Sequence, residues 1–157
     1  MTSNSLSNAA VVSTTPLTTL ASTPSYADIQ SIVADDFDIM DKQVFGSLNS
    51  KVKLVMSVSQ HVINAGGKRM RPLITLLCAR MFNDEPSQQA MHLAAITEML
   101  HTATLVHDDV IDESGQRRGK PTANATWDNA TAVLVGDYLI ARAFNLLVGF
   151  QSLPLLQ

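Results

Sequence analysis

The feature of this sequence that most limits its possible folds is the spacing of its apolar residues, which recur three and four positions apart along most of the chain. This is the spacing of one face of an α-helix, which makes a turn about every 3.6 residues. No segment alternates apolar and polar residues for long enough to indicate a β-strand. The pattern therefore predicts an all-α fold class.

Capping and helix-breaking residues divide this pattern into separate helices. Ser50 and Ser87 are suited to be N-caps, and Pro72 suits a first helical turn. The pair Gly66–Gly67 is typical of the end of a helix. The predicted helices begin near Tyr26 and after Ser50, and the later ones cover approximately residues 72–81, 87–112 and 125–149.

Residues 1–25 differ in composition from the rest of the chain. Twelve of them are Ser or Thr, and no Lys or Arg occurs before Lys42. A secretory signal requires basic residues ahead of an apolar segment, and a mitochondrial presequence requires arginines. We therefore predict that residues 1–25 form a disordered polar tail and that residues 26–157 form the folded part.

Charge and composition argue against several classes of function. The net charge is −3, with 11 Lys and Arg against 14 Asp and Glu, and aromatic residues make up 5% of the chain. These values argue against nucleic-acid binding, both through bulk positive charge and through base stacking. The single cysteine, Cys78, excludes an intramolecular disulfide. Apolar stretches are interrupted before the roughly 18 residues of a membrane span, so we expect no transmembrane segment. A single cysteine is compatible with a reducing cytosol, and we expect a cytoplasmic protein.

Aspartates near the end of the predicted helix over residues 87–112 are the first candidates for chemistry. Asp108 and Asp112 stand one turn apart on one face, with Asp109 about 100° round the helix. Such carboxylates repel each other, and oxygen ligands with room for water and phosphate suit Mg²⁺. A solvated acidic helix end is the alternative. Three further polar residues lie on the same side of the helix as Asp108: Thr97, His101 and Thr104.

Six of the 11 basic residues fall into two short clusters, at residues 68–71 and 117–120. The first cluster precedes a helix N-terminus, where free N–H groups favour an anion. The second directly follows the aspartates. Either cluster alone could be a solvated basic loop, but together with the aspartates they indicate Mg²⁺ and two phosphate-bearing substrates. The members are Lys68, Arg69 and Arg71 in the first cluster and Arg117, Arg118 and Lys120 in the second.

Three segments, in this order, resemble the trans-polyprenyl diphosphate synthase family. They are GGKRMRP at residues 66–72, His101 followed by DDVID at residues 108–112, and RRGKPT at residues 117–122. The resemblance covers about residues 30 to 150. It implies an isoprenoid synthase-type helical bundle, of which this chain would be the N-terminal portion.

The resemblance also implies a reaction and a role for each matched residue. The reaction is head-to-tail prenyl transfer between isopentenyl diphosphate and an allylic diphosphate, expected to be farnesyl diphosphate, with Mg²⁺ as cofactor. Asp108 and Asp112 would bind the metal, assisted by Asp109. Arg117 would bind the diphosphate of the allylic substrate. The residues that would bind the diphosphate of isopentenyl diphosphate are Lys68, Arg71, His101 and Arg118.

Product length is implied by Ala103 and Thr104, one turn before Asp108. In the family, aromatic residues here stop the growing chain early, whereas small ones leave the passage open. The resemblance thus favours an octaprenyl or nonaprenyl chain for the ubiquinone side chain. From the residues alone, Ala103 could instead serve close helix packing.

The second aspartate-rich motif of the family has no counterpart here, since no acidic residue follows Asp137. We therefore expect an N-terminal half, truncated before that motif, that is inactive alone. Its apolar faces are expected to cause self-association, as a homodimer or through non-native pairing. The alternatives are a non-catalytic partner or regulatory subunit and a terpene cyclase. A cyclase has no second diphosphate substrate for the basic cluster at residues 68–71 to hold.

Overall fold

The computed structural model describes residues 23–48, 50–83 and 86–155. Most of the predicted polar tail therefore lies outside the described residues. The helices are α1 (Tyr26–Ser31), α2 (Ala34–Ser47), α3 (Lys53–Ile63), α4 (Met70–Arg80), α5 (Gln88–Ile111), α6 (Ala123–Thr126) and α7 (Asn129–Val148). The other elements are the strands β1 (Gln116–Arg117) and β2 (Lys120–Pro121) and the 3₁₀ helix η1 (Leu153–Leu155).

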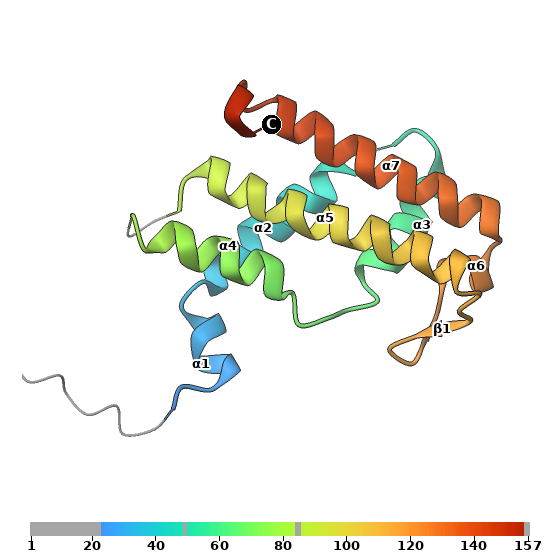
Figure 1. Ribbon diagram of the computed structural model, residues 1–157, viewed down its shortest axis with the longest axis horizontal. Coiled ribbons are helices and arrows are strands. Elements are labelled where there is room, and N and C mark those ends of the chain that lie inside the picture. The colour runs from blue at the N-terminus through green and yellow to red at the C-terminus, as the bar shows by residue number, and fades with distance from the viewer. Residues whose placement is uncertain (1–22, 49, 84–85, 156–157) are drawn as a thin grey trace, which may run out of the picture.

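The central helix of the fold is α5 (Figure 1). It runs alongside α7, with which it makes its most extensive contact, and α4 and α2 also pack against it. The hairpin of β1 and β2, followed by α6, connects the end of α5 to the start of α7. This arrangement confirms the predicted all-α class and places the hairpin beside the C-terminal end of α5.

Small residues allow α5 and α7 to approach each other closely. Ala103 on α5 and Ala132 and Ala143 on α7 are completely buried. A Cβ atom on Gly136 would lie 2.5 Å from Cδ2 of His107 and still closer to Nε2, so glycine makes room for this imidazole ring. Burial of large apolar side chains stabilises the fold by about 1.5–3 kcal/mol each. The largest of those in the core are Met40, Leu73, Leu76, Met99 and Leu139.

Local signals set some helix boundaries as predicted and others differently. Ser87 caps α5, because its hydroxyl accepts a hydrogen bond from the backbone N–H of Ala90 at 3.2 Å. The predicted Ser50 cap is wrong, since α3 has Val52 as its N-cap and no side-chain capping bond. The last predicted helix is divided into α6 and α7, because Asp128 accepts a hydrogen bond from the N–H of Thr131 at 2.7 Å and starts a new helix.

Two more differences concern short elements. The first predicted helical run is broken by a turn at residues 32–33, which separates α1 from α2. The hairpin was not expected, because strands of two residues are too short to show an alternating pattern.

Helix α7 bears on the expectation that no segment crosses a membrane. With 20 residues and a mean hydropathy of 1.5, it is long and apolar enough to do so by length and composition alone. Core helices of soluble proteins pass the same test when they are mostly buried, whereas α7 buries Val135 and Leu139 against α5 but only 28% of its apolar window in all. The absence of a membrane span therefore stays a prediction.

Candidate functional site

The site begins at the turn between α3 and α4. Helix α3 ends at Ile63, and Gly66 follows with φ of +82°, a left-handed conformation in which a side chain would be strained. Lys68 follows this turn, and Arg71 lies in the first turn of α4. The sequence prediction of a glycine turn leading into a helix N-terminus is confirmed, and basic side chains lie beside the free N–H groups of α4.

The same turn is held in place from its other side. The guanidinium of Arg69 forms an ion pair with Asp41 of α2, and the hydroxyl of Tyr26 in α1 donates a hydrogen bond to the carbonyl oxygen of Lys68. Arg69 is therefore engaged within the protein. Lys68 and Arg71, by contrast, form no ion pair with any residue that the structure describes.

The hairpin after α5 docks against the end of α3. The Nζ of Lys120 donates a hydrogen bond to the carbonyl oxygen of Asn64 at 2.7 Å, and Nε2 of His61 lies 2.8 Å from the carbonyl oxygen of Pro121. Arg118 occupies the turn with φ of +54° and is followed by Gly119 with φ of +76°. These contacts bring the two basic clusters together, although about 50 residues separate them in sequence.

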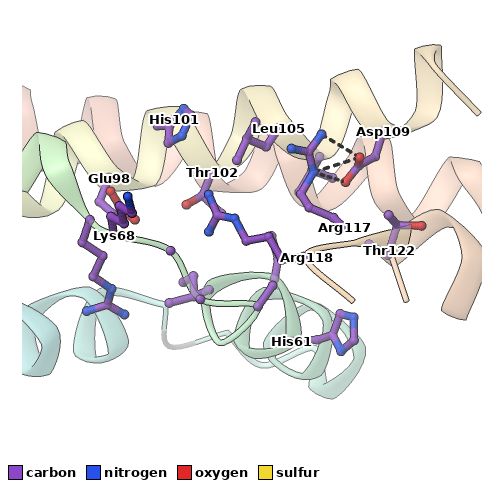
Figure 2. Close-up of a pocket in the computed structure, with 18 of the residues that line it drawn as sticks. His61, Lys68, Glu98, His101, Thr102, Leu105, Asp109, Arg117, Arg118 and Thr122 are labelled. Atoms are coloured by element: carbon purple, nitrogen blue, oxygen red, sulfur yellow. Dashed lines mark hydrogen bonds and ion pairs between the residues drawn. The ribbon is translucent and has the colours of Figure 1, made fainter. Parts of the chain in front are cut away.

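A cavity of about 540 Å³ lies between the glycine turn, the hairpin and α5 (Figure 2). It confirms that both basic clusters face one hollow. Two aspartates are the exception, because Asp108 and Asp112 are exposed at the end of α5 and do not line the cavity. The predicted site residues that do line it are Lys68, Arg71, His101, Asp109, Arg117 and Arg118.

The face of α5 that lines the cavity differs from the polar stripe proposed from the sequence. Of that stripe, only His101 lines the cavity, whereas the hydroxyls of Thr97 and Thr104 donate to carbonyl oxygens of α5 itself, each at 2.8 Å. The predicted face and the observed face differ by about one residue along α5. Sequence spacing does not show which side of α5 the neighbouring helices cover, so it could not predict this rotation. The lining face consists of Glu98, His101, Thr102, Leu105, Val106 and Asp109.

Glu98 is the main residue that the sequence analysis missed. It stands 11 residues before Asp109, which is about three helical turns, so the two acidic residues share a face. Two acidic residues at this spacing within an otherwise apolar helix are the signal by which the sequence could have indicated Glu98. Burial raises the pKa of Glu98, and the nearby cations of Arg69, Arg71 and Arg118 only partly offset this effect.

Asp109 is the buried carboxylate of the site, and it binds Arg117 through two nitrogens. Nε of Arg117 lies 3.0 Å from both carboxylate oxygens, and Nη2 lies 2.8 Å from Oδ1 (Figure 2). The side chain of Asp109 is 8% exposed and that of Arg117 is 31% exposed. Hydrogen bonding to Asp109 raises the pKa of Arg117 further above its usual value. The aspartate thus fixes the direction of the guanidinium.

The electrostatics of the cavity favour an anionic ligand. Burial lowers the pKa of His101, and the positive charges of Arg71, Arg118 and Arg117 lower it further, whereas Asp108 acts in the opposite direction. A ligand carrying several negative charges would neutralise these cations. Because Arg guanidinium groups bind phosphate oxygens in pairs, diphosphates are well suited to this cavity.

Among the described residues, Asp108 and Asp112 are the pair of carboxylates best placed to hold a metal together with other ligands. Within the described ranges, no three His, Cys, Asp or Glu residues lie close enough together to hold an ion on their own. Asp108 and Asp112 are exposed one turn apart, and their carboxylates form no ion pair with a described residue. Mg²⁺ is commonly bound by one or two carboxylates together with water and substrate phosphates, so this pair fits that ion.

The two residues expected to influence product length lie in different environments. Ala103 is completely buried in the core, and Thr104 is exposed on the outside of α5. Since Thr104 is four residues before Asp108, it shares the face of the acidic pair, whereas Ala103 does not.

Comparison with known proteins identifies the family. The chain belongs to the polyprenyl synthetase family, which matches residues 52–157. It is 62% identical over 130 residues to an all-trans-nonaprenyl-diphosphate synthase (geranyl-diphosphate specific) of Rhodobacter capsulatus, a match that covers 83% of this chain and 40% of that protein. The resemblance noted from the three motifs is thereby confirmed.

Solved structures support the same assignment. The crystal structure of a decaprenyl diphosphate synthase from Rhodobacter capsulatus superimposes with a TM-score of 0.79 at 43% identity, covering 83% of this chain and 40% of that one. A polyprenyl synthase from Caulobacter crescentus, crystallised with calcium and isoprenyl diphosphate, gives 0.78 at 39% identity, over 85% and 40% of the two chains. The predicted isoprenoid synthase-type helical bundle is confirmed, and the chain spans about 40% of the length of these relatives.

Proposed function

We propose that this chain forms the diphosphate-binding part of a long-chain trans-polyprenyl diphosphate synthase. Such an enzyme joins isopentenyl diphosphate head to tail to an allylic diphosphate. The observation that supports this proposal most strongly is the cavity that is lined by both basic loops and, on α5, by the carboxylate of Asp109. Cations on two separate loops suit two diphosphate groups better than one.

The cations of the cavity divide into two groups according to their partners. Arg117 is oriented by Asp109, which contacts Nε and Nη2 and leaves Nη1 for a ligand. We assign Arg117 to the allylic diphosphate. The second group has no ion-pair partner among the described residues and is assigned to isopentenyl diphosphate. Its members are Lys68, Arg71 and Arg118, with His101 as a neighbouring hydrogen-bond donor.

Asp108 and Asp112 would hold Mg²⁺ at the exposed C-terminal end of α5. The metal would supply positive charge to the departing diphosphate of the allylic substrate. Arg117 would stabilise the same charge from a fixed direction, because Asp109 holds it before the substrate binds. The apolar side chains of Leu105 and Val106 would exclude water from part of the reacting centre.

The substrate and product can be proposed from the relatives and from α5. We propose a product of octaprenyl or nonaprenyl length, as for the ubiquinone side chain, because neither Ala103 nor Thr104 is large enough to block a passage along α5. The farnesyl diphosphate expected from the sequence competes with geranyl diphosphate, which the name of the Rhodobacter relative specifies. Both primers therefore belong in the test.

Three further properties are proposed for the chain on its own. We propose that the 157-residue chain is inactive alone, because its sequence contains only the first aspartate-rich motif of the family. We also propose a cytoplasmic location and self-association, for which the exposed apolar residues of α7 provide a surface. These residues are Val133, Leu134, Phe144 and Val148.

A chimera tests the proposed function directly. The 130 matched residues of this chain would replace the corresponding segment of the Rhodobacter nonaprenyl-diphosphate synthase. The chimera should convert isopentenyl diphosphate and geranyl or farnesyl diphosphate into a long polyprenyl diphosphate, and Asp108→Ala should abolish the product. Asp35→Ala, at an exposed position of α2, is the matched control.

The outcomes also separate the alternatives. A folded chimera without prenyl transfer would contradict the proposal and favour a non-catalytic partner subunit. Cyclic hydrocarbon formed from the allylic substrate alone would favour a terpene cyclase. Full activity of Asp108→Ala would remove the metal assignment.

A further inference from the structure

Gly67 and Arg118 form the closest contact between the two basic loops. A Cβ atom on Gly67 would lie 2.9 Å from Cζ and 3.0 Å from Nη2 of Arg118, and still closer to Nη1. Side chains do not pack this tightly, so the guanidinium occupies the space that any larger residue at position 67 would need. The φ of Gly67 is +159°, a conformation that residues with a side chain rarely adopt, so both the backbone and the limited space favour glycine here.

This contact sets where the Arg118 cation lies. Arg118 is at the turn of the hairpin, and its side chain extends from there toward the part of α5 that carries His101 and Thr102 (Figure 2). It forms no ion pair with a described residue that could direct it, in contrast to Arg117, which Asp109 holds. The surface of the glycine turn is therefore what supports the guanidinium.

The hairpin is fixed well enough for this support to be effective. Lys120 bonds to the carbonyl oxygen of Asn64, and His61 lies at hydrogen-bond distance from Pro121. On the other side, Tyr26 and Asp41 hold the glycine turn through Lys68 and Arg69. With both loops anchored, the gap over Gly67 has a defined width, and Arg118 fits it only because the side chain at position 67 is absent.

We propose that Gly67 is a positioning residue, which seats the Arg118 guanidinium so that it joins Lys68 and Arg71 around one diphosphate. This inference rests on the proposed function, because it concerns the group assigned to isopentenyl diphosphate. A methyl group at position 67 displaces the far end of a flexible side chain, so it moves the cation, and it also strains the backbone at this φ. The loss of ligand affinity should therefore depend on the presence of Arg118, whereas the loss of stability from the backbone strain should not.

Isothermal titration calorimetry of the full 157-residue chain with isopentenyl diphosphate tests this role. Gly67→Ala should weaken binding about tenfold, as expected for the loss of one charge-assisted hydrogen bond. Arg118→Met should weaken it by a similar factor. In the Arg118→Met background, Gly67→Ala should have little further effect, because the side chain that it displaces is already absent.

The matched control is Gly115→Ala, at the base of the hairpin, where a Cβ atom meets nothing within 4 Å and φ is not positive. Its affinity should equal that of the unsubstituted chain, and thermal unfolding should show that all four variants remain folded. If Gly67→Ala binds normally, or weakens binding equally with and without Arg118, the positioning role is wrong. If the unsubstituted chain does not bind isopentenyl diphosphate, the proposed diphosphate site itself is wrong. Binding by the unsubstituted chain therefore separates a failure of the proposed function from a failure of the positioning role of Gly67.

Discussion

Replacing Arg117 should destabilise the protein more than replacing its ion-pair partner Asp109. Arg117→Met leaves a carboxylate that is only 8% exposed without its partner. Removing one member of a buried pair costs about 3–5 kcal/mol, and we take about 3 kcal/mol because the Arg117 side of the pair is open to water. Asp109→Asn leaves a guanidinium that is 31% exposed and can be hydrated, so its cost should be about 1 kcal/mol.

These values can be measured as melting temperatures. In a chain of this size, 1 kcal/mol corresponds to about 2–4 °C. Arg117→Met should therefore lower the melting temperature by about 6–12 °C and Asp109→Asn by about 2–4 °C, as followed by circular dichroism at 222 nm. The double variant should be more stable than Arg117→Met, because it no longer buries an unpaired charge. Equal losses, or a double variant less stable than Arg117→Met, would refute this reasoning.

Three further predictions concern other residues of the site. Glu98→Gln should raise the melting temperature more at pH 7 than at pH 4. The raised pKa of Glu98 means that the folded chain loses stability as the pH rises and this carboxylate ionises, a loss that Gln avoids. An equal gain at both pH values would contradict this reasoning. His101→Gln should reduce the loss of stability that occurs as the pH falls below about 6.5. The lowered pKa of His101 means that the folded chain binds this proton less readily than the unfolded chain, so protonation favours unfolding. An unchanged pH profile would count against this role of His101. Lys120→Met should lower the melting temperature by about 1–4 °C through loss of the bond to the carbonyl oxygen of Asn64. Lys53→Met, at an exposed position of α3, should not lower it, and equal effects of the two variants would argue against the docking of the hairpin.

Signals that act within a few residues were sufficient to predict much of the fold. Ser87 caps α5 through its own hydroxyl, and the turn after α3 requires a left-handed φ at position 66, which glycine adopts without strain. Both are visible in sequence because their cause lies in the local backbone. The break at Asp128 has an equally local cause, but the apolar spacing continues across it and concealed the new helix start.

The sequence predicted which residues belong to the site but not how they are arranged in space. The motifs showed that the two basic clusters and the aspartates belong together, and the cavity unites most of them. The phase of α5 could not be predicted, because it depends on where α7, α4 and α2 pack. For this reason Asp109, expected only to assist, is the aspartate that lines the cavity, and Asp108 lies outside its wall. The contact of Arg118 with Gly67 likewise depends on loops that are distant in sequence.

The central claim is that the acidic end of α5 and the two basic loops together hold a magnesium-bound diphosphate. The most direct measurement is calorimetric binding of geranyl diphosphate to the 157-residue chain, with Mg²⁺ and with a chelator in its place. Magnesium should increase the affinity about tenfold. This gain should vanish in Asp108→Asn/Asp112→Asn and persist in Asp35→Asn/Asp38→Asn, an exposed acidic pair of α2. An unchanged magnesium gain in the α5 double variant would contradict the account.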